Sequence, residues 1–299
     1  MSHGERDTRR REAPTDHDDL RAAVVALARV VGLDAPGLAD RLEQGDPRDA
    51  LAEELGADTT LLPENPGHKL AETVQQIAAW ERRGLRCLSV RDPGYPPALH
   101  MVHDRPPLLW LAGDPTLVDD SRPAIAVVGT RHPTDQGLAA ARTIAVDLVR
   151  AGFVVLSGLA AGIDAAAHEA AIAAGGRTVA VIGTGHDHVY PPQNADLQAR
   201  LAREHAVVSP FWPQDGPSPE RFRRRNAVTS GLGLGTVIVE ASVRSGTRVQ
   251  ARLALAHGRR VFLLRPLLSQ DWAAELARRS AVHVVGSAAD IIEIAGLSA

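Results

Sequence analysis

Three short loops, each next to an apolar run, carry the residues of this sequence best suited to bind an anion. Their glycines would let the backbone approach a ligand closely, and a helix beginning after each loop would present free N–H groups. An arginine in such a loop can donate two parallel N–H groups to one phosphate. The pattern therefore predicts a phosphate-binding surface, made of Gly129, Thr130 and Arg131, then Ser157, Gly158 and Gly162, and then Ser245, Gly246 and Thr247.

A fourth candidate segment combines an aromatic ring with arginines at the start of a predicted helix. It reads Phe222-Arg-Arg-Arg-Asn226, so Phe222 could stack on a base while Arg224, Arg225 and Asn226 contact phosphates. Stacking and charge neutralisation are the two main energetic parts of single-strand binding. Tyr190, in another predicted loop, could stack in the same way or pack beneath its own loop.

The remaining polar residues near these loops favour a structural role. Asp164 and His168 are four residues apart and would share one helix face. They could form an acid–base pair or half of a metal site, but a helix-capping Asp164 and a His168 bonded to a buried carbonyl are the favoured interpretation. Glu240, at the end of another predicted strand, is also assigned a structural place near the site.

The sequence gives little indication of catalysis or of a bound metal. His186, Asp187 and His188 lie together, but no third ligand follows at a spacing typical of zinc. The chain shows no recognisable Ser/His/Asp or Cys/His set and no Walker lysine. We therefore predict a binding protein rather than an enzyme, with no catalytic residue, no metal and no cofactor.

From residue 124 onward, apolar runs alternate regularly with helical patterns, which predicts a doubly wound α/β domain with a mostly parallel sheet. In such sheets ligands bind beyond the carboxyl ends of the strands, where all the candidate loops fall. The predicted strands are 124–128, 153–157, 178–182, 206–209, 236–240, 260–264 and 282–285. The predicted helices are 135–151, 163–174, 194–203, 219–231, 246–257, 269–279 and 288–295.

The first part of the chain has a different organisation. We predict a disordered leader over 1–19, a small helical module over 20–83, a Pro-rich connector with short strands over 84–123, and the α/β domain over 124–299. No apolar run reaches the roughly 20 residues that a membrane span needs, so no membrane association is expected. The single cysteine, Cys87, excludes an intramolecular disulfide and agrees with a cytoplasmic location.

The charge of the chain is unevenly distributed. The formal net charge is −3, which argues against unspecific adhesion to nucleic acid. Between residues 221 and 260, however, the only acid is Glu240, whereas the arginines are 221, 223, 224, 225, 244, 248, 252, 259 and 260. Arginine suits bidentate phosphate contacts, although such a cluster can also be a solvated face.

In this order the motifs resemble those of the DprA (Smf) family of DNA-processing proteins. The matching elements include Val128-Gly-Thr-Arg131, Ser157-Gly-Leu-Ala-Ala-Gly-Ile-Asp164 with His168, the run from Thr178 to Tyr190-Pro191, Arg225-Asn226, and Ser245-Gly-Thr247. The resemblance implies an extended Rossmann-like domain that binds single-stranded DNA, forms a homodimer and loads a RecA-type recombinase during natural transformation. It also implies a phosphate pocket lined by Arg131, Ser157, Gly158, Arg225, Asn226 and Ser245.

The chain departs from the family pattern in several places. Arg223 stands where the family has proline, Ala227 replaces a basic residue, and Arg265-Pro266-Leu267 replaces a Pro-Gly turn. These differences leave open a diverged member that kept the fold and changed its ligand or partner. A nucleotide-processing enzyme of the lysine-decarboxylase-like type is the other alternative, because Gly231-Leu-Gly-Leu-Gly-Thr236 weakly resembles the Gly-rich loop of that group.

Overall fold

The computed structural model describes residues 16–57, 66–242 and 245–296. Its helices are α1 (Asp16–Val31), α2 (Leu38–Gln44), α3 (Pro47–Ala57), α4 (Pro66–Arg82), α5 (Pro97–His100), α6 (Asp135–Arg150), α7 (Ile163–Ala173), α8 (Ala195–Glu204), α9 (Pro219–Leu232), α10 (Thr247–Ala256), α11 (Asp271–Leu276) and α12 (Ala288–Ala295). Its strands are β1 (Leu85–Ser89), β2 (Leu108–Gly113), β3 (Ala124–Val128), β4 (Val154–Ser157), β5 (Thr178–Val181), β6 (Ala206–Ser209), β7 (Gly235–Ile238), β8 (Arg260–Leu264) and β9 (Val282–Val285).

The strands form one sheet in the order β1-β2-β6-β5-β4-β3-β7-β8-β9. From β6 to β9 every pairing is parallel, whereas β2 joins β6 and β1 joins β2 in antiparallel fashion. The chain moves outward from β3 through β4, β5 and β6, then returns by α9 to place β7 on the other side of β3. The predicted doubly wound α/β class is confirmed, and the direction of winding reverses between β3 and β7.

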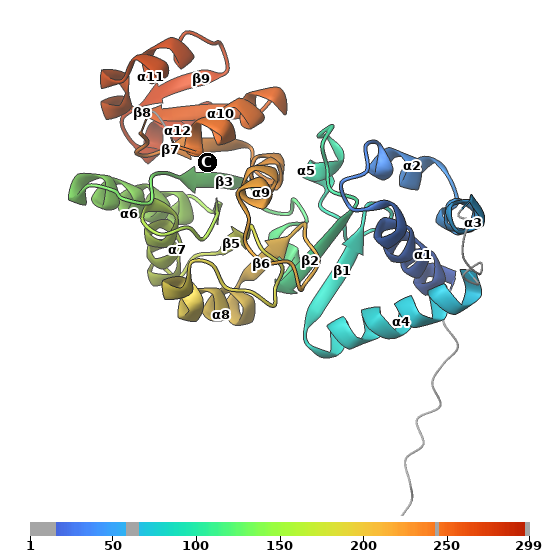
Figure 1. Cartoon of the computed structure of the whole chain (residues 1–299). Helices are drawn as coiled ribbons and strands as arrows, with labels where there is room; N and C mark the ends of the chain where they lie inside the picture. Colours follow the sequence, from blue (N-terminus) through green and yellow to red (C-terminus); the bar gives the residue numbers. More distant parts are fainter. Residues whose placement is uncertain (1–15, 58–65, 243–244, 297–299) are drawn as a thin grey trace, which may run out of the picture.

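Both faces of the sheet are covered because its central strands are apolar on both sides. Ile125 and Val127 of β3 pack in one core with residues of α6, α7 and α12. On the opposite face Ala124 and Ala126 join a second core that includes residues of α9, and α10 and α11 cover β7 and β8. Figure 1 shows the carboxyl-terminal elements, in orange and red, at one end of the sheet and the amino-terminal helices, in blue and cyan, at the other.

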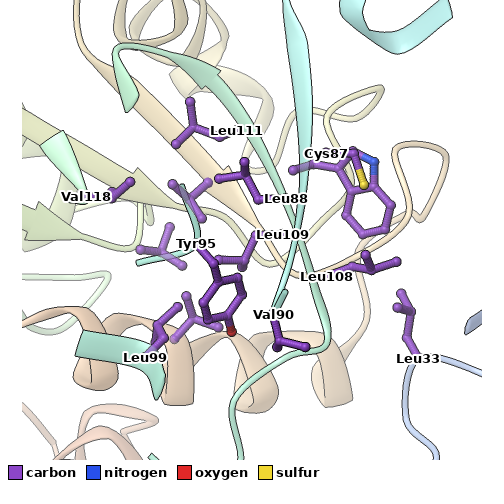
Figure 2. Close-up of a cluster of buried hydrophobic side chains, with 14 of the residues drawn as sticks. Leu33, Cys87, Leu88, Val90, Tyr95, Leu99, Leu108, Leu109, Leu111 and Val118 are labelled. Carbon is purple, nitrogen blue, oxygen red and sulfur yellow. The ribbon is translucent and has the colours of Figure 1, made fainter. Parts of the chain in front are cut away.

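The amino-terminal helices share a core with the sheet. Residues 22–28 of α1 are fully buried, and Trp80 of α4 meets Trp110 of β2 edge-on with ring centroids 5.6 Å apart. Figure 2 shows Tyr95 among Leu88, Leu99 and Leu109 in this core. The same apolar cluster continues through β1 and β2 into β4, β5 and β6. The segment predicted as a connector thus supplies two strands to the main sheet, and the domain boundary at residue 123 crosses both a continuous sheet and a continuous core.

Several boundaries differ from those the sequence predicted. Helix α1 begins at Asp16, so the end of the predicted leader is helical, while residues 1–15 lie outside the described part of the chain. Acidic residues in its first turn suit the positive end of the helix dipole. The predicted helix 269–279 shortens to α11. Among the described helices, none has the length and apolar character that crossing a bilayer requires.

Candidate functional site

A pocket of about 660 Å³ opens at the carboxyl edge of the sheet, where the winding reverses. The loop after β3 forms one side, the segment after β7 and the start of α10 form the second, and the first turns of α9 form the third. Doubly wound folds generally place their ligands at such a reversal point. The pocket brings together these predicted residues: Gly129, Thr130, Arg131, Asp164, Tyr190, Phe222, Arg225, Asn226, Ser245, Gly246 and Thr247.

One side of the pocket, which we call the open wall, presents Arg131, Tyr190 and Phe222. Arg131 is exposed, and its guanidinium carbon lies 5.4 Å from the centroid of the Phe222 ring. Phe222 is half-buried and lies 5.1 Å, centroid to centroid, from the ring of Tyr190, which is 37% exposed. A cation held over one aromatic ring beside another offers both a phosphate contact and a stacking surface.

The start of α10 continues the open wall. Gly246 is exposed, and the hydroxyls of Ser245 and Thr247 are hydrogen-bonded to each other at 2.7 Å. The Ser245 hydroxyl also accepts the backbone N–H of Thr247 at 3.2 Å, which positions the first turn of α10. The helix dipole gives this end a partial positive charge that favours an anion. Arg244, part of the arginine-rich segment, lies outside the described residues.

A second group of residues at the pocket, which we call the closed wall, is centred on Arg225. This arginine is 7% exposed, and its Nη1 donates to the carbonyls of Gly158 at 2.6 Å and of Val181 at 2.5 Å. Its Nε donates to the side chain of Asn226 at 3.1 Å. Burial lowers the pKa of Arg225, and the carboxylate of Asp164 opposes that shift. Arg225 therefore joins α9 to the loop after β4 and to the last residue of β5, and its Nε and Nη1 donate within the protein.

Arg225 can occupy its position only because residue 158 is a glycine. A Cβ at this position would overlap the guanidinium group, so the glycine makes room for an internal cation. The Gly158 N–H is also used internally, because it donates to Asp164 Oδ2 at 3.1 Å. The sequence predicts that this loop approaches a bound anion. In the structure the Arg225 guanidinium lies beside Gly158, and both residues line a cavity of about 230 Å³ together with Arg131, Tyr190 and Phe222.

Asp164 bonds two of the predicted anion-binding loops to each other. It accepts the Gly129 N–H at 3.3 Å as well as that of Gly158. Burial raises the pKa of this carboxyl, while Arg225 and the backbone N–H groups act in the opposite direction. Ser157 is fully buried and its hydroxyl donates to the Val127 carbonyl at 2.7 Å, so it does not face the pocket.

His168 lies below the closed wall in the core. Its Nδ1 is 2.7 Å from the Thr178 hydroxyl, which itself donates to the Val155 carbonyl at 2.7 Å. The hydroxyl proton is thus already used, so Nδ1 carries the proton of a neutral ring. Burial is the main cause that lowers the pKa of His168 to about 3. The histidine joins α7 to β5 through a threonine hydroxyl rather than through the predicted carbonyl.

Three other predicted residues have internal or distant partners. Glu240 accepts the Thr134 N–H at 3.1 Å and its hydroxyl at 2.9 Å, so a carboxylate of the protein occupies the start of α6. Gly162 has a φ of 84°, and a Cβ there would overlap the Thr130 carbonyl. Arg224 pairs with Asp34, and it lines a second pocket between α9 and the amino-terminal helices. It therefore does not join the predicted cluster.

The pocket also contains residues outside the predicted set. They are chiefly His132, Ser218 and Gln250, with Arg223, which pairs with Glu220 at 2.5 Å. The position of His132 directly after Arg131 was an available signal. Ser218 caps α9 by accepting the N–H of Arg221, and the Ser-Pro before that helix was another signal. No sequence signal indicated Gln250, because its position depends on the packing of α10.

The Gly-rich segment and the histidine-rich loop named in the sequence lie apart from this pocket or have partners of their own. The Gly-rich segment 231–236 enters β7, and Leu234 donates its N–H to Ala124 at the start of β3, so the segment lies at the amino edge of the sheet. The histidine-rich loop is divided among separate partners: His186 contacts the Trp110 carbonyl, His188 the Gln214 carbonyl, and Asp187 pairs with Arg83. Cys87 is buried, which raises the pKa of its thiol.

The comparisons with known proteins agree on one family. The family model described as DNA recombination-mediator protein A matches residues 86–295. The DNA processing protein DprA of Bacillus subtilis is 32% identical, over 92% of this chain and 95% of its own length. That of Streptococcus pneumoniae is 39% identical, over 59% of this chain and 61% of its own length.

Two solved structures extend this similarity to the fold. The X-ray structure of DNA processing protein A from Streptococcus pneumoniae aligns with a TM-score of 0.74 at 32% identity, covering 91% of this chain and 97% of the other. A structure of DNA processing protein A from Helicobacter pylori, described for its single-stranded DNA binding mode, aligns with a TM-score of 0.62 at 27% identity. That alignment covers 70% of this chain and 94% of the other.

Proposed function

Because the chain belongs to the DNA recombination-mediator protein A family, we propose that it binds single-stranded DNA at the carboxyl edge of its sheet. The observation that carries this proposal is the open wall, where the exposed Arg131 lies over the half-buried ring of Phe222 and beside Tyr190. Phosphate would bind Arg131 and the start of α10, and a base would stack on the aromatic pair. Every base has a π-face, so the expected binding tolerates many sequences.

In this proposal the closed wall holds the site without contacting DNA. Arg225 and Asp164 are buried and bonded to backbone groups of the loops that surround the pocket. Protein atoms thus hold these loops in place, and the DNA strand contacts only the exposed side chains. The neutralisation of phosphates by a few arginines predicts marked salt dependence, because counterions are released on binding.

Fluorescence anisotropy with labelled oligo-dT and its duplex, over a series of salt concentrations, tests the proposal. We expect salt-sensitive binding that favours the single strand, weakened by Arg131→Ala. Arg150→Ala is the matched control, because Arg150 is a well-exposed arginine at the far end of α6. Binding that is insensitive to salt, or equally weakened by both substitutions, would contradict the assignment. Failure to bind oligo-dT at low salt would also contradict the assignment and would favour a small nucleotide as the ligand.

We further propose that the protein acts as a homodimer in the cytoplasm and transfers the bound strand to a RecA-type recombinase. The description of the family as a recombination mediator supports this finer role. Strand exchange by RecA on DNA coated with single-strand-binding protein should be accelerated by the wild type and not by Arg131→Ala. DNA binding without acceleration would indicate a member of the family with a different partner. Sedimentation velocity measures the oligomeric state independently.

A further inference from the structure

Three potential metal ligands meet away from the DNA site, where the segment between α5 and β2 touches the end of α10. His103 and Asp104 come from the first segment, and His257 follows α10 directly. The ligand atoms of the three side chains all lie within 4.8 Å of one another. His257 Nε2 is 2.7 Å from Asp104 Oδ1, and the rings of His103 and His257 meet edge-on at 5.5 Å.

Ser230 lies against the second ring nitrogen of His257, Nδ1, at 2.8 Å. When the Ser230 hydroxyl donates to the Ala227 carbonyl 3.1 Å away, its oxygen accepts the Nδ1 proton of His257. With Nδ1 protonated, a neutral His257 presents the lone pair of Nε2 to a carboxylate oxygen only 2.7 Å away. Either a proton on Nε2 or a metal ion between the two atoms makes this contact favourable.

The surroundings favour a ligand role over a catalytic one. Ser230 is 1% exposed, so the Ser230–His257–Asp104 series does not present a nucleophile to solvent. The His257 side chain is fully buried, whereas that of Asp104 is 33% exposed and His103 is an exposed residue. A fixed inner histidine whose second N–H is held by the protein, with two ligands facing water, is the usual construction of a metal site with one open position.

We propose that His103, Asp104 and His257 bind a divalent transition-metal ion, with Zn²⁺ the best match. Two imidazole nitrogens and one carboxylate oxygen are a ligand set typical of Zn²⁺, and water would complete the tetrahedron. Metal–ligand bonds of roughly 2.0–2.2 Å place tetrahedral ligand atoms roughly 3.3 Å apart. The carboxylate and His257 would therefore separate slightly, while His103 would move inward. The bound ion would link the Pro-rich segment between α5 and β2 to the end of α10.

Titration of the full-length protein with Zn²⁺ by calorimetry, together with the visible absorption of Co²⁺ as a spectroscopic probe, tests the site. We expect one Zn²⁺ per chain and a tetrahedral Co²⁺ spectrum for the wild type. His103→Ala should abolish both, although it leaves the Asp104–His257 pair intact and thus tests binding without breaking that contact. Ser230→Ala should weaken affinity roughly 10- to 100-fold, as expected when the partner of a ligating histidine is removed.

His68→Ala is the control for nonspecific Zn²⁺ binding by surface histidines. His68 is an exposed histidine, 3.7 Å from Glu72, which offers a two-ligand pair without a third member. Zn²⁺ binding should be unchanged by this substitution, and excess Zn²⁺ should raise the melting temperature of the wild type but not of His103→Ala. If the wild type binds no more Zn²⁺ than His103→Ala does, only a proton lies between His257 and Asp104, and the proposal is overturned. None of these measurements involves DNA.

Discussion

Arg131 and Arg225 line the same pocket, were both predicted to contact phosphate, and differ in their surroundings. Arg131 is exposed and rests over the ring of Phe222, so its N–H donors are directed toward solvent or a ligand. Arg225 is buried, lies near Asp164, and donates to two backbone carbonyls. The comparison shows that an arginine beside a glycine-rich loop can supply either the ligand contact or the scaffold.

The same contrast holds for the two walls as a whole. In the closed wall, the Gly158 N–H, the Asp164 carboxylate and the Ser157 hydroxyl all have partners within the protein. In the open wall, the side chains of Arg131 and Tyr190 reach the surface. Substitutions in the closed wall should therefore change the free energy of unfolding, and substitutions in the open wall should change DNA affinity.

The largest expected effect is that of Arg225→Ala. It would leave the carbonyls of Gly158 and Val181 without a donor and Asp164 without its nearby cation. Breaking a buried charged contact of this kind costs about 3 to 5 kcal/mol of unfolding free energy. Urea denaturation measures this loss, and Arg225→Lys, which keeps the charge, should lose less. A variant of wild-type stability that no longer binds DNA would place Arg225 in the open wall instead.

Phe222→Ala should give the largest effect on DNA binding. Removing a base-stacking ring costs about 1 to 3 kcal/mol of binding free energy. Anisotropy with oligo-dT measures the change, and Phe222→Tyr should restore affinity because it keeps the ring. Equal affinity of all three proteins would show that the strand does not reach the aromatic pair.

The buried His168 makes the closed wall sensitive to acid. Its pKa is lowered to about 3 by burial, so below the ordinary value near 6.5 the unfolded chain binds a proton that the folded chain does not. Stability attributable to His168 is therefore present above pH 6.5 and is lost as the pH falls. Between pH 7 and pH 5 this loss is about 2 kcal/mol. His168→Gln should show a shallower decline in urea denaturation, and an unchanged slope would contradict this role.

Arg131→Ala should produce the smallest free-energy change and the most specific one. Loss of one phosphate contact lowers the slope of log affinity against log salt by about 0.7 for a single strand. Its unfolding free energy should stay within about 0.5 kcal/mol of wild type, as for other surface substitutions. A slope equal to that of Arg150→Ala would remove Arg131 from the phosphate contacts.

Much of the fold was predictable because its strands are determined by local apolar patterns. Four strands, β3, β6, β8 and β9, have the predicted bounds, and the family assignment from ordered motifs is confirmed. The antiparallel pairing of β2 with β6 joins residues almost a hundred positions apart, so no local pattern indicated it. The sequence likewise predicted short strands within the connector 84–123, but no local pattern indicated that they belong to the main sheet.

The site was less predictable, since neighbouring residues on a helix face different directions. Consecutive side chains on α9 are turned by roughly 100°. Arg223 therefore faces the first pocket and the second, Arg224 faces the second, and Arg225 is buried. A run of three arginines indicates charge but not which member is exposed. Ser157 shows the same limit, because its hydroxyl could bond outward or, as found, to the neighbouring strand.

The hydrogen bonds from Arg225 to the loop after β4 and to the end of β5 also bear on how fast a ligand would bind. They join this edge of the sheet to α9, the helix that carries Phe222 in its first turns. When a DNA strand binds at the pocket, the Phe222 ring is already in position and the surrounding backbone does not have to become ordered. Association should then be limited by encounter and orientation rather than by a conformational step, and differences among variants should be seen mainly in the dissociation rate.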